Sequence, residues 1–265
     1  MCSIWIRRWP ARTETRPTAE CTSGSNQART TIVNKAVCAV VGVGPGNGAA
    51  IARRFAAAGY VVALLARSSS FTDALAGELE GAVAFACDVT SEVDVTSTFA
   101  RISADLGPVQ TLVYNAGSGV WGDVEAITAA GFESTWRVNA LGMLLTAQQV
   151  IPAMKAAGKG NIIVIGATAS RRGGVRSAAF APAKAAQRSL AQSMARSLWP
   201  AGIHVAMVII DGVVDLERTR QAMPDKPDSF YVQSDAVAAT VYWLSQQPSS
   251  AWAFEVEARP FGEAW

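Results

Sequence analysis

A run of glycines near the start of the apolar part of the chain is the feature best suited to binding a phosphate group. Gly42, Gly46 and Gly48, with Asn47 between the last two, follow an apolar run and open a stretch of helical pattern. Glycines let the chain turn tightly and let backbone N–H groups at the positive end of a helix approach a pyrophosphate. Because the motif lies between an expected strand and an expected helix, we interpret it as a dinucleotide-binding loop rather than a structural turn.

A polar pair after the next apolar run indicates which dinucleotide binds. Arg67 and Ser68 come directly after residues 61–66, where NAD-binding proteins have a carboxylate for the adenosine ribose. Arg67 can donate two hydrogen bonds to a 2′-phosphate, and Ser68 can add a hydroxyl. The sequence therefore favours NADP(H), with NAD(H) as the alternative cofactor. A solvated loop charge is the competing interpretation of Arg67.

These residues need a scaffold, and short apolar runs that alternate with longer helical stretches predict a parallel sheet covered on both faces. The expected class is α/β, a doubly wound Rossmann fold with about seven strands. Strands are expected at 36–43, 61–66, 82–86, 110–114, 161–165, 204–210 and 253–257. Helices are expected at 48–58, 72–79, 91–106, 132–157, 181–198 and 234–246.

Length and composition suit one domain. The chain has 265 residues, of which 50% are hydrophobic, so residues 35–265 can bury one sizeable core. Residues 1–34 carry arginines among Ser, Thr and Pro without periodicity, and we expect a disordered extension there. An organelle transit peptide is the competing interpretation, against which Glu14 and Glu20 count.

Charge and cysteine usage exclude several classes of partner. The formal net charge is only +2, without a basic stripe, and the apolar runs fall short of the roughly 20 residues that span a membrane. Four cysteines without a Cys-x-x-Cys pair favour a reducing compartment, and the one histidine, His204, lies in an expected buried strand. We therefore expect a cytoplasmic protein with a small-molecule substrate and no nucleic acid, membrane or metal partner.

Taken in chain order, the motifs resemble those of the short-chain dehydrogenase/reductase family. The family spacing G-x-x-x-G-x-G matches the three glycines of the loop, and the resemblance extends over residues 36–258. It implies further cofactor contacts, by Asp88 and Val89 at the adenine, Asn115, Ala116 and Gly117 in the cleft, Val214 at the carboxamide and Lys184 at the nicotinamide ribose.

The resemblance also locates the catalytic motif, which is altered here. The family has Tyr-x-x-x-Lys with a Ser thirteen residues before the Tyr, and these positions correspond to Phe180, Lys184 and Ala167. Lys184 is retained, and so is Asn139, which in the family holds a water in a proton relay. Phe and Ala can neither donate a proton nor bond a carbonyl oxygen. Since general acid catalysis typically contributes 10²- to 10⁴-fold, ordinary ketone reduction should be impaired.

Other hydroxyls are candidates for a replacement proton donor. Thr168 and Ser170 follow the fifth expected strand, and Tyr231 lies in segment 216–233, which in the family forms a mobile lid. For each of them, an ordinary packing or loop hydroxyl is the competing interpretation. In the same part of the chain, Leu216 stands where the family has a Thr that steadies the carboxamide.

Three functions remain open. The leading hypothesis is an NADP(H)-dependent oxidoreductase that transfers hydride to an already electrophilic substrate, an iminium ion or a conjugated alkene. The alternatives are a non-redox enzyme on the same fold, for a cyclisation or an elimination, and a catalytically silent NADP(H)-binding protein. The resemblance and the apolar carboxyl-terminal segment also imply a homodimer or homotetramer.

Overall fold

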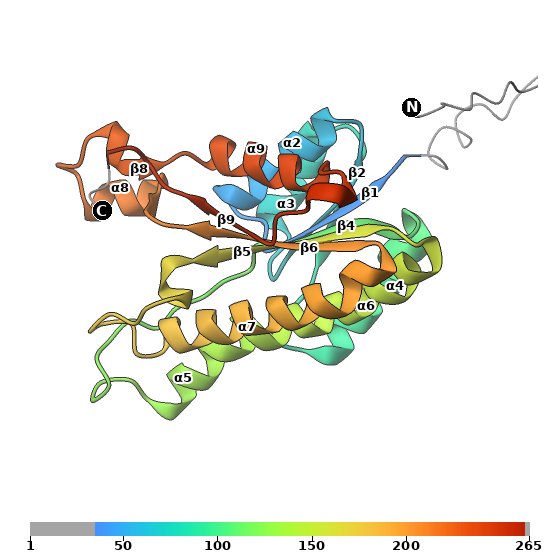
Figure 1. Cartoon of the computed structure of the whole chain (residues 1–265). Coiled ribbons are helices and arrows are strands. Elements are labelled where there is room, and N and C mark those ends of the chain that lie inside the picture. Colours follow the sequence, from blue (N-terminus) through green and yellow to red (C-terminus); the bar gives the residue numbers. More distant parts are fainter. Residues whose placement is uncertain (1–34, 263–265) are drawn as a thin grey trace, which may run out of the picture.

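A seven-stranded parallel sheet forms the middle layer of the computed structural model, which describes residues 35–262 (Figure 1). The strand order is β3-β2-β1-β4-β5-β6-β9. The strands are β1 Val37–Val41, β2 Val61–Ala66, β3 Ala82–Ala86, β4 Val109–Tyr114, β5 Gly160–Ala167, β6 Ile203–Ile210 and β9 Glu255–Ala258. All six pairings within this sheet are parallel, so the predicted doubly wound α/β fold is confirmed.

Helices cover both faces of the sheet. One face carries α2 Asn47–Ala57, α3 Ser70–Glu78 and α9 Ser234–Ser245, and the other carries α4 Glu92–Asp105, α5 Ala129–Trp136, α6 Gly142–Ala157 and α7 Phe180–Leu198 (Figure 1). Alternate residues of β1 enter different cores, Ala39 and Val41 on one side and Cys38 and Val40 on the other. A strand buried on both faces must be apolar throughout, which is why β1 and β2 are continuous apolar runs in the sequence.

The strand order reverses at β1. The chain moves from β1 outward through β2 to β3, and then returns to place β4 on the other side of β1. Such a reversal leaves a crevice at the carboxyl ends of the two central strands, where doubly wound proteins bind their ligands. The loops that follow β1 and β4 are therefore positioned to form a site.

The expected elements agree with the structure to within a few residues, with one informative exception. The predicted helix 132–157 is interrupted by a π-helical turn at Arg137–Leu141, in which the Gly142 N–H donates to the Arg137 carbonyl. The hydroxyl of Tyr114, from β4, donates to the Val138 carbonyl at 2.5 Å within that turn. This partner lies 24 residues away in sequence, so helical periodicity could not reveal the turn.

The segment after β6 contains elements that the sequence did not predict. Strands β7 Val213–Val214 and β8 Tyr231–Val232 form a two-stranded parallel sheet, and α8 Glu217–Ala222 lies between them. This segment stands at the carboxyl ends of the main strands (Figure 1). The expectation for residues 1–34 lies outside the described part of the chain.

Candidate functional site

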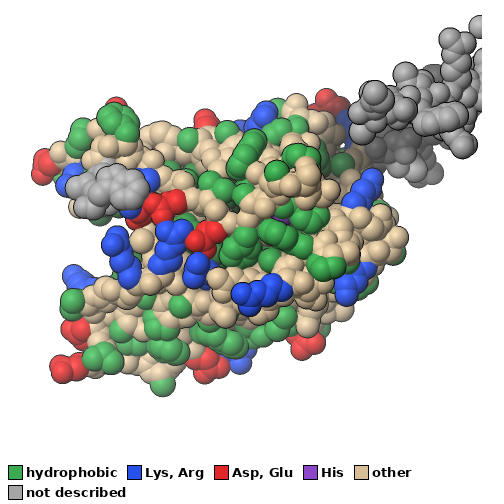
Figure 2. Space-filling model, in the orientation of Figure 1, with side chains coloured by type: hydrophobic (Ala, Val, Ile, Leu, Met, Phe, Trp, Pro, Cys, Tyr) green, Lys and Arg blue, Asp and Glu red, His purple; other side chains and the backbone are tan. Residues whose placement is uncertain are grey.

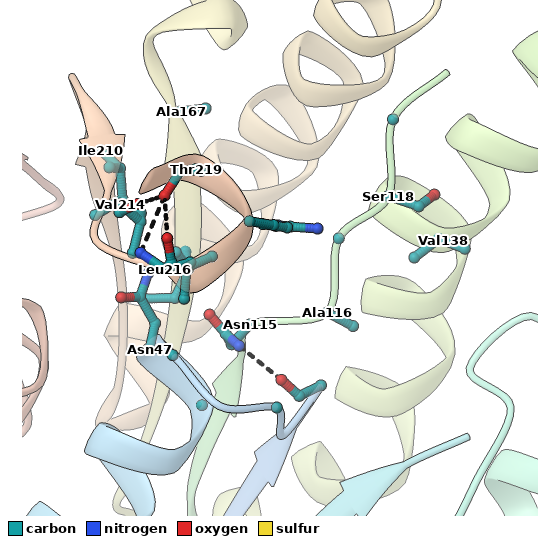
Figure 3. Close-up of a pocket in the computed structure, with 18 of the residues that line it drawn as sticks. Asn47, Asn115, Ala116, Ser118, Val138, Ala167, Ile210, Val214, Leu216 and Thr219 are labelled. Atoms are coloured by element: carbon teal, nitrogen blue, oxygen red, sulfur yellow. Dashed lines mark hydrogen bonds between the residues drawn. The ribbon is translucent and has the colours of Figure 1, made fainter. Parts of the chain in front are cut away.

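A cleft of about 1390 Å³ opens at the carboxyl ends of the central strands (Figure 3). Its walls are the loop between β1 and α2, the segment after β4, the ends of β5 and β6, and the segment from Gly212 to Ala222. Small-molecule sites typically measure roughly 300 to 1,000 Å³, so this cleft has room for a dinucleotide together with a substrate.

The glycine loop is packed backbone to backbone against the end of β4. Gly42 has φ +87°, and a Cβ added there would lie 2.4 Å from the Ala116 backbone. A Cβ at Gly48 would lie 2.7 Å from the Gly42 carbonyl oxygen. Asn115 ties the loop in place, because its Nδ2 donates to the same oxygen at 2.7 Å. Only glycine fits these two positions, and the loop is thereby held against the cleft.

The loop leads into the amino end of α2, which suits an anion. The first N–H groups of a helix have no intrahelical acceptor, and the helix dipole makes this end positive. No acidic residue lies in the first turn of α2. Gly46, Asn47 and Gly48 all line the cleft, as the dinucleotide interpretation requires. These residues fit a bound pyrophosphate.

Arg67 and Ser68 lie at the far end of the cleft, after β2, and both are exposed. Val89 also lines this end, whereas its neighbour Asp88 lies just outside the lining. The Asp88 carboxylate accepts hydrogen bonds from the N–H and the hydroxyl of Thr90, and these hold its pKa below the usual value. The structure therefore brings Arg67, Ser68 and Val89 to one end of the cleft, with Asp88 beside them.

Lys184 and Asn139 meet in the middle of the cleft wall. Lys184 is only 6% exposed, and its Nζ donates to the Ile165 carbonyl at 3.2 Å and to Gln187 Oε1 at 3.0 Å. Burial lowers the pKa of Lys184 to about 8. A Cβ added at Gly117 would lie 3.6 Å from Lys184 Nζ and 3.4 Å from Asn139 Oδ1, so both polar atoms face one point.

The π-helical turn sets the position of Asn139. This side chain is fully buried, and its Nδ2 donates to the carbonyls of Ser118 at 2.7 Å and Thr135 at 2.8 Å. Its Oδ1 has no partner among the described residues. Since buried polar atoms are nearly always hydrogen bonded, this oxygen is suited to hold a water or a ligand group beside Lys184.

An aromatic wall, made of Trp121 and Phe180, lies next to these polar groups. The two ring centroids are 4.8 Å apart at an interplanar angle of 37°, and Trp121 remains 60% exposed. A Cβ at Gly119 would lie 2.9 Å from the Phe180 ring, so this glycine makes room for the wall. Ala167 lines the cleft at the end of β5. Phe180 and Ala167, the two positions at which the sequence resemblance implied hydroxyls, thus present hydrocarbon surface.

Three sequence-predicted hydroxyls do not line the cleft. Thr168 Oγ1 is 2.5 Å from an Asp211 carboxylate oxygen, and the Tyr231 hydroxyl donates to the Met223 carbonyl at 2.7 Å. Ser170 is buried, and its hydroxyl has no partner among the described residues. The structure does not bring these three side chains to Lys184.

Sequence reasoning missed other lining residues, among them Trp121, Ser118 and Thr219. Thr219 lies in α8, where its hydroxyl accepts from the Leu216 N–H at 3.0 Å and lies 2.7 Å from the Val214 carbonyl oxygen. A single Trp or Thr gives no signal by itself, because its place in the cleft depends on how segments distant in sequence pack.

Figure 2 shows basic and acidic side chains gathered at the hollowed end of the molecule. Arg171 pairs with Glu255 and Glu257, and Arg188 also pairs with Glu255. Arg171 is therefore neutralised within the chain.

The described residues contain no group of three or more His, Cys, Asp or Glu side chains that could hold a metal ion. No described helix is both long and apolar enough to cross a membrane.

Known proteins resemble this chain in sequence and in fold. Residues 36–226 match the family model described as short chain dehydrogenase. A 3-oxoacyl-[acyl-carrier-protein] reductase from Mus musculus is 31% identical over 218 residues, covering 80% of this chain and 92% of the mouse protein. A short-chain dehydrogenase structure from Rhodopseudomonas palustris has a TM-score of 0.74 at 36% identity, covering 85% of this chain and 99% of that one. A metagenomic short-chain oxidoreductase in complex with NADP has a TM-score of 0.75 at 27% identity, covering 88% of this chain and 100% of that one.

Proposed function

This chain belongs to the short-chain dehydrogenase family, and from that premise we propose that it is an NADP(H)-dependent oxidoreductase acting on an iminium ion or a conjugated alkene. The observation that carries the proposal is the pair Phe180 and Ala167, which line the cleft beside Lys184 without a hydroxyl. A substrate that is already electrophilic accepts the hydride without a hydroxyl side chain protonating its oxygen in the same step. The altered residues therefore select for activated substrates.

Three observations support NADP(H) as the cofactor. The glycine loop and the amino end of α2 fit a pyrophosphate, and Arg67 with Ser68 suits a 2′-phosphate at the far end of the same cleft. The metagenomic relative was solved in complex with NADP. NAD(H) is the alternative cofactor. When bound, the reduced cofactor supplies a hydride from its nicotinamide ring.

Lys184 supplies the proton that a conjugated alkene requires. An ammonium group has three N–H donors, and Ile165 and Gln187 use two of them. Addition of a hydride to the β-carbon of an enone leaves an enolate, which the third N–H, or a water between Lys184 and Asn139, protonates. A pKa of about 8 makes Lys184 a better acid than an ordinary lysine while it remains charged at neutral pH. An iminium ion becomes a neutral amine on accepting the hydride and needs no proton.

The aromatic wall supports a planar substrate. Conjugated alkenes and iminium ions are flat, and flat π systems stack on aromatic faces at the distances that separate Trp121 from Phe180. An iminium ion gains a cation–π attraction to the same rings. Both substrate classes therefore fit the surface beside Lys184.

The name of the mouse relative suggests a second substrate class, 3-oxoacyl ketones carried on acyl carrier protein. Phe180 and Ala167 weigh against this class, because a ketone oxygen develops negative charge and the two side chains cannot donate to it. We therefore expect ketone reduction to be slow.

Incubation with NADPH and a panel of ketones, imines and enones tests the proposal. NADPH consumption with imines or enones alone is the expected result. Product formation without loss of NADPH would instead identify a non-redox enzyme, and NADPH binding without any reaction would identify a silent dinucleotide-binding protein. Rapid turnover of simple ketones would overturn the proposed role of Phe180 and Ala167.

We also propose a single cytoplasmic domain over residues 35–265 that forms a homodimer or homotetramer, with residues 1–34 as an extension. Val93 in α4 and Phe132 and Trp136 in α5 are exposed apolar side chains, which support self-association. Cys38 and Cys87 are free, buried thiols, which supports a reducing compartment. Light scattering on the purified protein measures the oligomeric state.

A further inference from the structure

Asn47, the first residue of α2, has a buried hydrogen-bond acceptor without a partner. Its side-chain oxygen Oδ1 is covered, and no described group donates to it. Buried polar atoms in folded proteins are nearly always hydrogen bonded, so this oxygen points to a donor from outside the chain. Asn47 also lines the cleft, so a rotation of its side-chain amide would present this oxygen to a donor on a ligand there.

The surroundings of Asn47 restrict where that donor lies. Figure 3 shows the Asn47 side chain extending from the start of α2 toward Val214 and Leu216. Leu216 packs against the glycine loop, since a Cβ added at Gly46 would lie 2.5 Å from Leu216 Cδ2. Asn47 therefore lies between the glycine loop, which fits a pyrophosphate, and the wall formed by Val214 and Leu216.

That wall has few hydrogen-bonding groups to offer. Val214 and Leu216 have hydrocarbon side chains, and the Val214 carbonyl already bonds the Thr219 hydroxyl. The same hydroxyl accepts from the Leu216 N–H. Beside this wall, the Asn47 side-chain oxygen is therefore a hydrogen-bond acceptor that is still unpaired.

The chemistry of a dinucleotide identifies the donor. An amide oxygen only accepts hydrogen bonds, and the ionised pyrophosphate has no proton to donate. The adenine amino group belongs to the opposite end of the cleft, near Arg67, Ser68 and Val89. Lys184, which can bond the nicotinamide ribose, projects from α7 rather than from this wall. The ribose hydroxyls are donors too, but those of the nicotinamide ribose lie toward Lys184 and those of the adenosine ribose toward Arg67, so the carboxamide NH₂ of the nicotinamide is the donor that suits this wall.

We propose that Asn47 recognises the nicotinamide carboxamide, with Oδ1 accepting a hydrogen bond from its NH₂ group. This inference rests on the proposed function, because it presupposes a nicotinamide dinucleotide in the cleft. The bond fixes which way the carboxamide points and hence the rotation of the nicotinamide ring. It also makes the site distinguish an amide from a ketone or an acid at the same ring position.

Calorimetric titration with two cofactors tests the inference without any catalysis. The ligands are NADP⁺ and its 3-acetylpyridine analogue, whose methyl ketone has no N–H. The unaltered protein should bind NADP⁺ about tenfold more tightly, since the analogue leaves a buried acceptor unpaired. Asn47→Ala should bind the two ligands equally. Asn161→Ala, at the amino end of β5 and away from the cleft, is the matched control and should keep the full preference.

Two further measurements separate recognition of the carboxamide from a contribution of Asn47 to binding the rest of the dinucleotide. The fragment 2′-phospho-ADP-ribose has no nicotinamide, so Asn47→Ala should bind it as tightly as the unaltered protein does. Asn47→Asp retains an acceptor in nearly the same shape, so it should still prefer NADP⁺ over the analogue. Its negative charge beside the pyrophosphate should weaken the binding of every dinucleotide.

The outcomes that overturn the inference differ from those that overturn the proposed function. An undiminished preference for NADP⁺ in Asn47→Ala would show that another group reads the carboxamide. An equal loss for the nicotinamide-free fragment would assign Asn47 to the pyrophosphate instead. If the unaltered protein binds neither dinucleotide, the proposed function itself fails.

Discussion

The Nζ atom of Lys184 lies 5.8 Å from the centre of the Phe180 ring, one helical turn further along α7. Side chains at i and i+4 share one face of a helix, so both reach the cleft. The lysine therefore faces an aromatic ring at the position where the sequence resemblance predicts a phenol.

Restoring the hydroxyls should create ketone reductase activity. Phe180→Tyr with Ala167→Ser adds one oxygen at each position, and the Lys184 charge would lower the pKa of the new phenol. NADPH oxidation with an activated ketone should increase in the double variant by more than the product of the two single gains, because both hydroxyls act on one carbonyl oxygen. No gain in a folded, NADPH-binding double variant would show that the cleft is shaped for a different reaction.

Enone reduction should depend on the charge of Lys184. Its ammonium must be protonated to donate, and its pKa of about 8 means that the protonated fraction falls above that pH. At saturating NADPH, kcat should therefore be constant below about pH 7 and decrease roughly tenfold per pH unit well above pH 8. Lys184→Arg, which stays charged across this range, should lose the decrease. An unchanged pH profile in that variant would assign the proton to another donor.

Arg67→Asp should reverse the cofactor preference. The change replaces a donor to the 2′-phosphate by a like charge, so the affinity for NADPH should fall about 10- to 100-fold while that for NADH changes little. Calorimetry on both cofactors measures the two effects. Arg196→Asp, an exposed change of the same charge on α7, controls for net charge and should affect both cofactors alike. Equal losses in Arg67→Asp would contradict the assignment of the 2′-phosphate to Arg67.

Gly142→Ala should destabilise the turn that holds Asn139. A Cβ at Gly142 would lie 2.5 Å from the Tyr114 hydroxyl oxygen and 2.9 Å from Val89, so the Tyr114 bond to Val138 must shift. Overpacking of this kind costs about 1–3 kcal/mol, and each kcal/mol lowers the melting temperature by about 2–4 °C in a protein of this size.

Another helical glycine provides the control for that prediction. Gly77 in α3 has no atom within 4 Å of its would-be Cβ, so Gly77→Ala should leave the melting temperature unchanged or raise it. Similar melting temperatures for the two variants would mean that the turn tolerates the displacement of Tyr114.

The sequence determined the scaffold because local pattern and burial agree along most of the chain. Continuous apolar runs such as Val61–Ala66 and Ala82–Ala86 gave strands with the expected bounds. The glycines could be recognised because only a residue without a Cβ fits between β1 and β4. The spacing of Phe180 and Lys184 was sufficient to place both on one face of α7.

The tertiary structure alone decided how the cleft is lined. Thr168 and Ser170 follow a strand in the right place, yet neither lines the cleft: the Thr168 hydroxyl lies against Asp211, and Ser170 is buried. Trp121 and Leu216 come from loops without a pattern and form walls of the site. The π-helical turn at Asn139 depends on Tyr114, which is distant in sequence. A repeating pattern records which face of an element is buried, whereas the direction of one polar side chain depends on contacts between elements that no local pattern encodes.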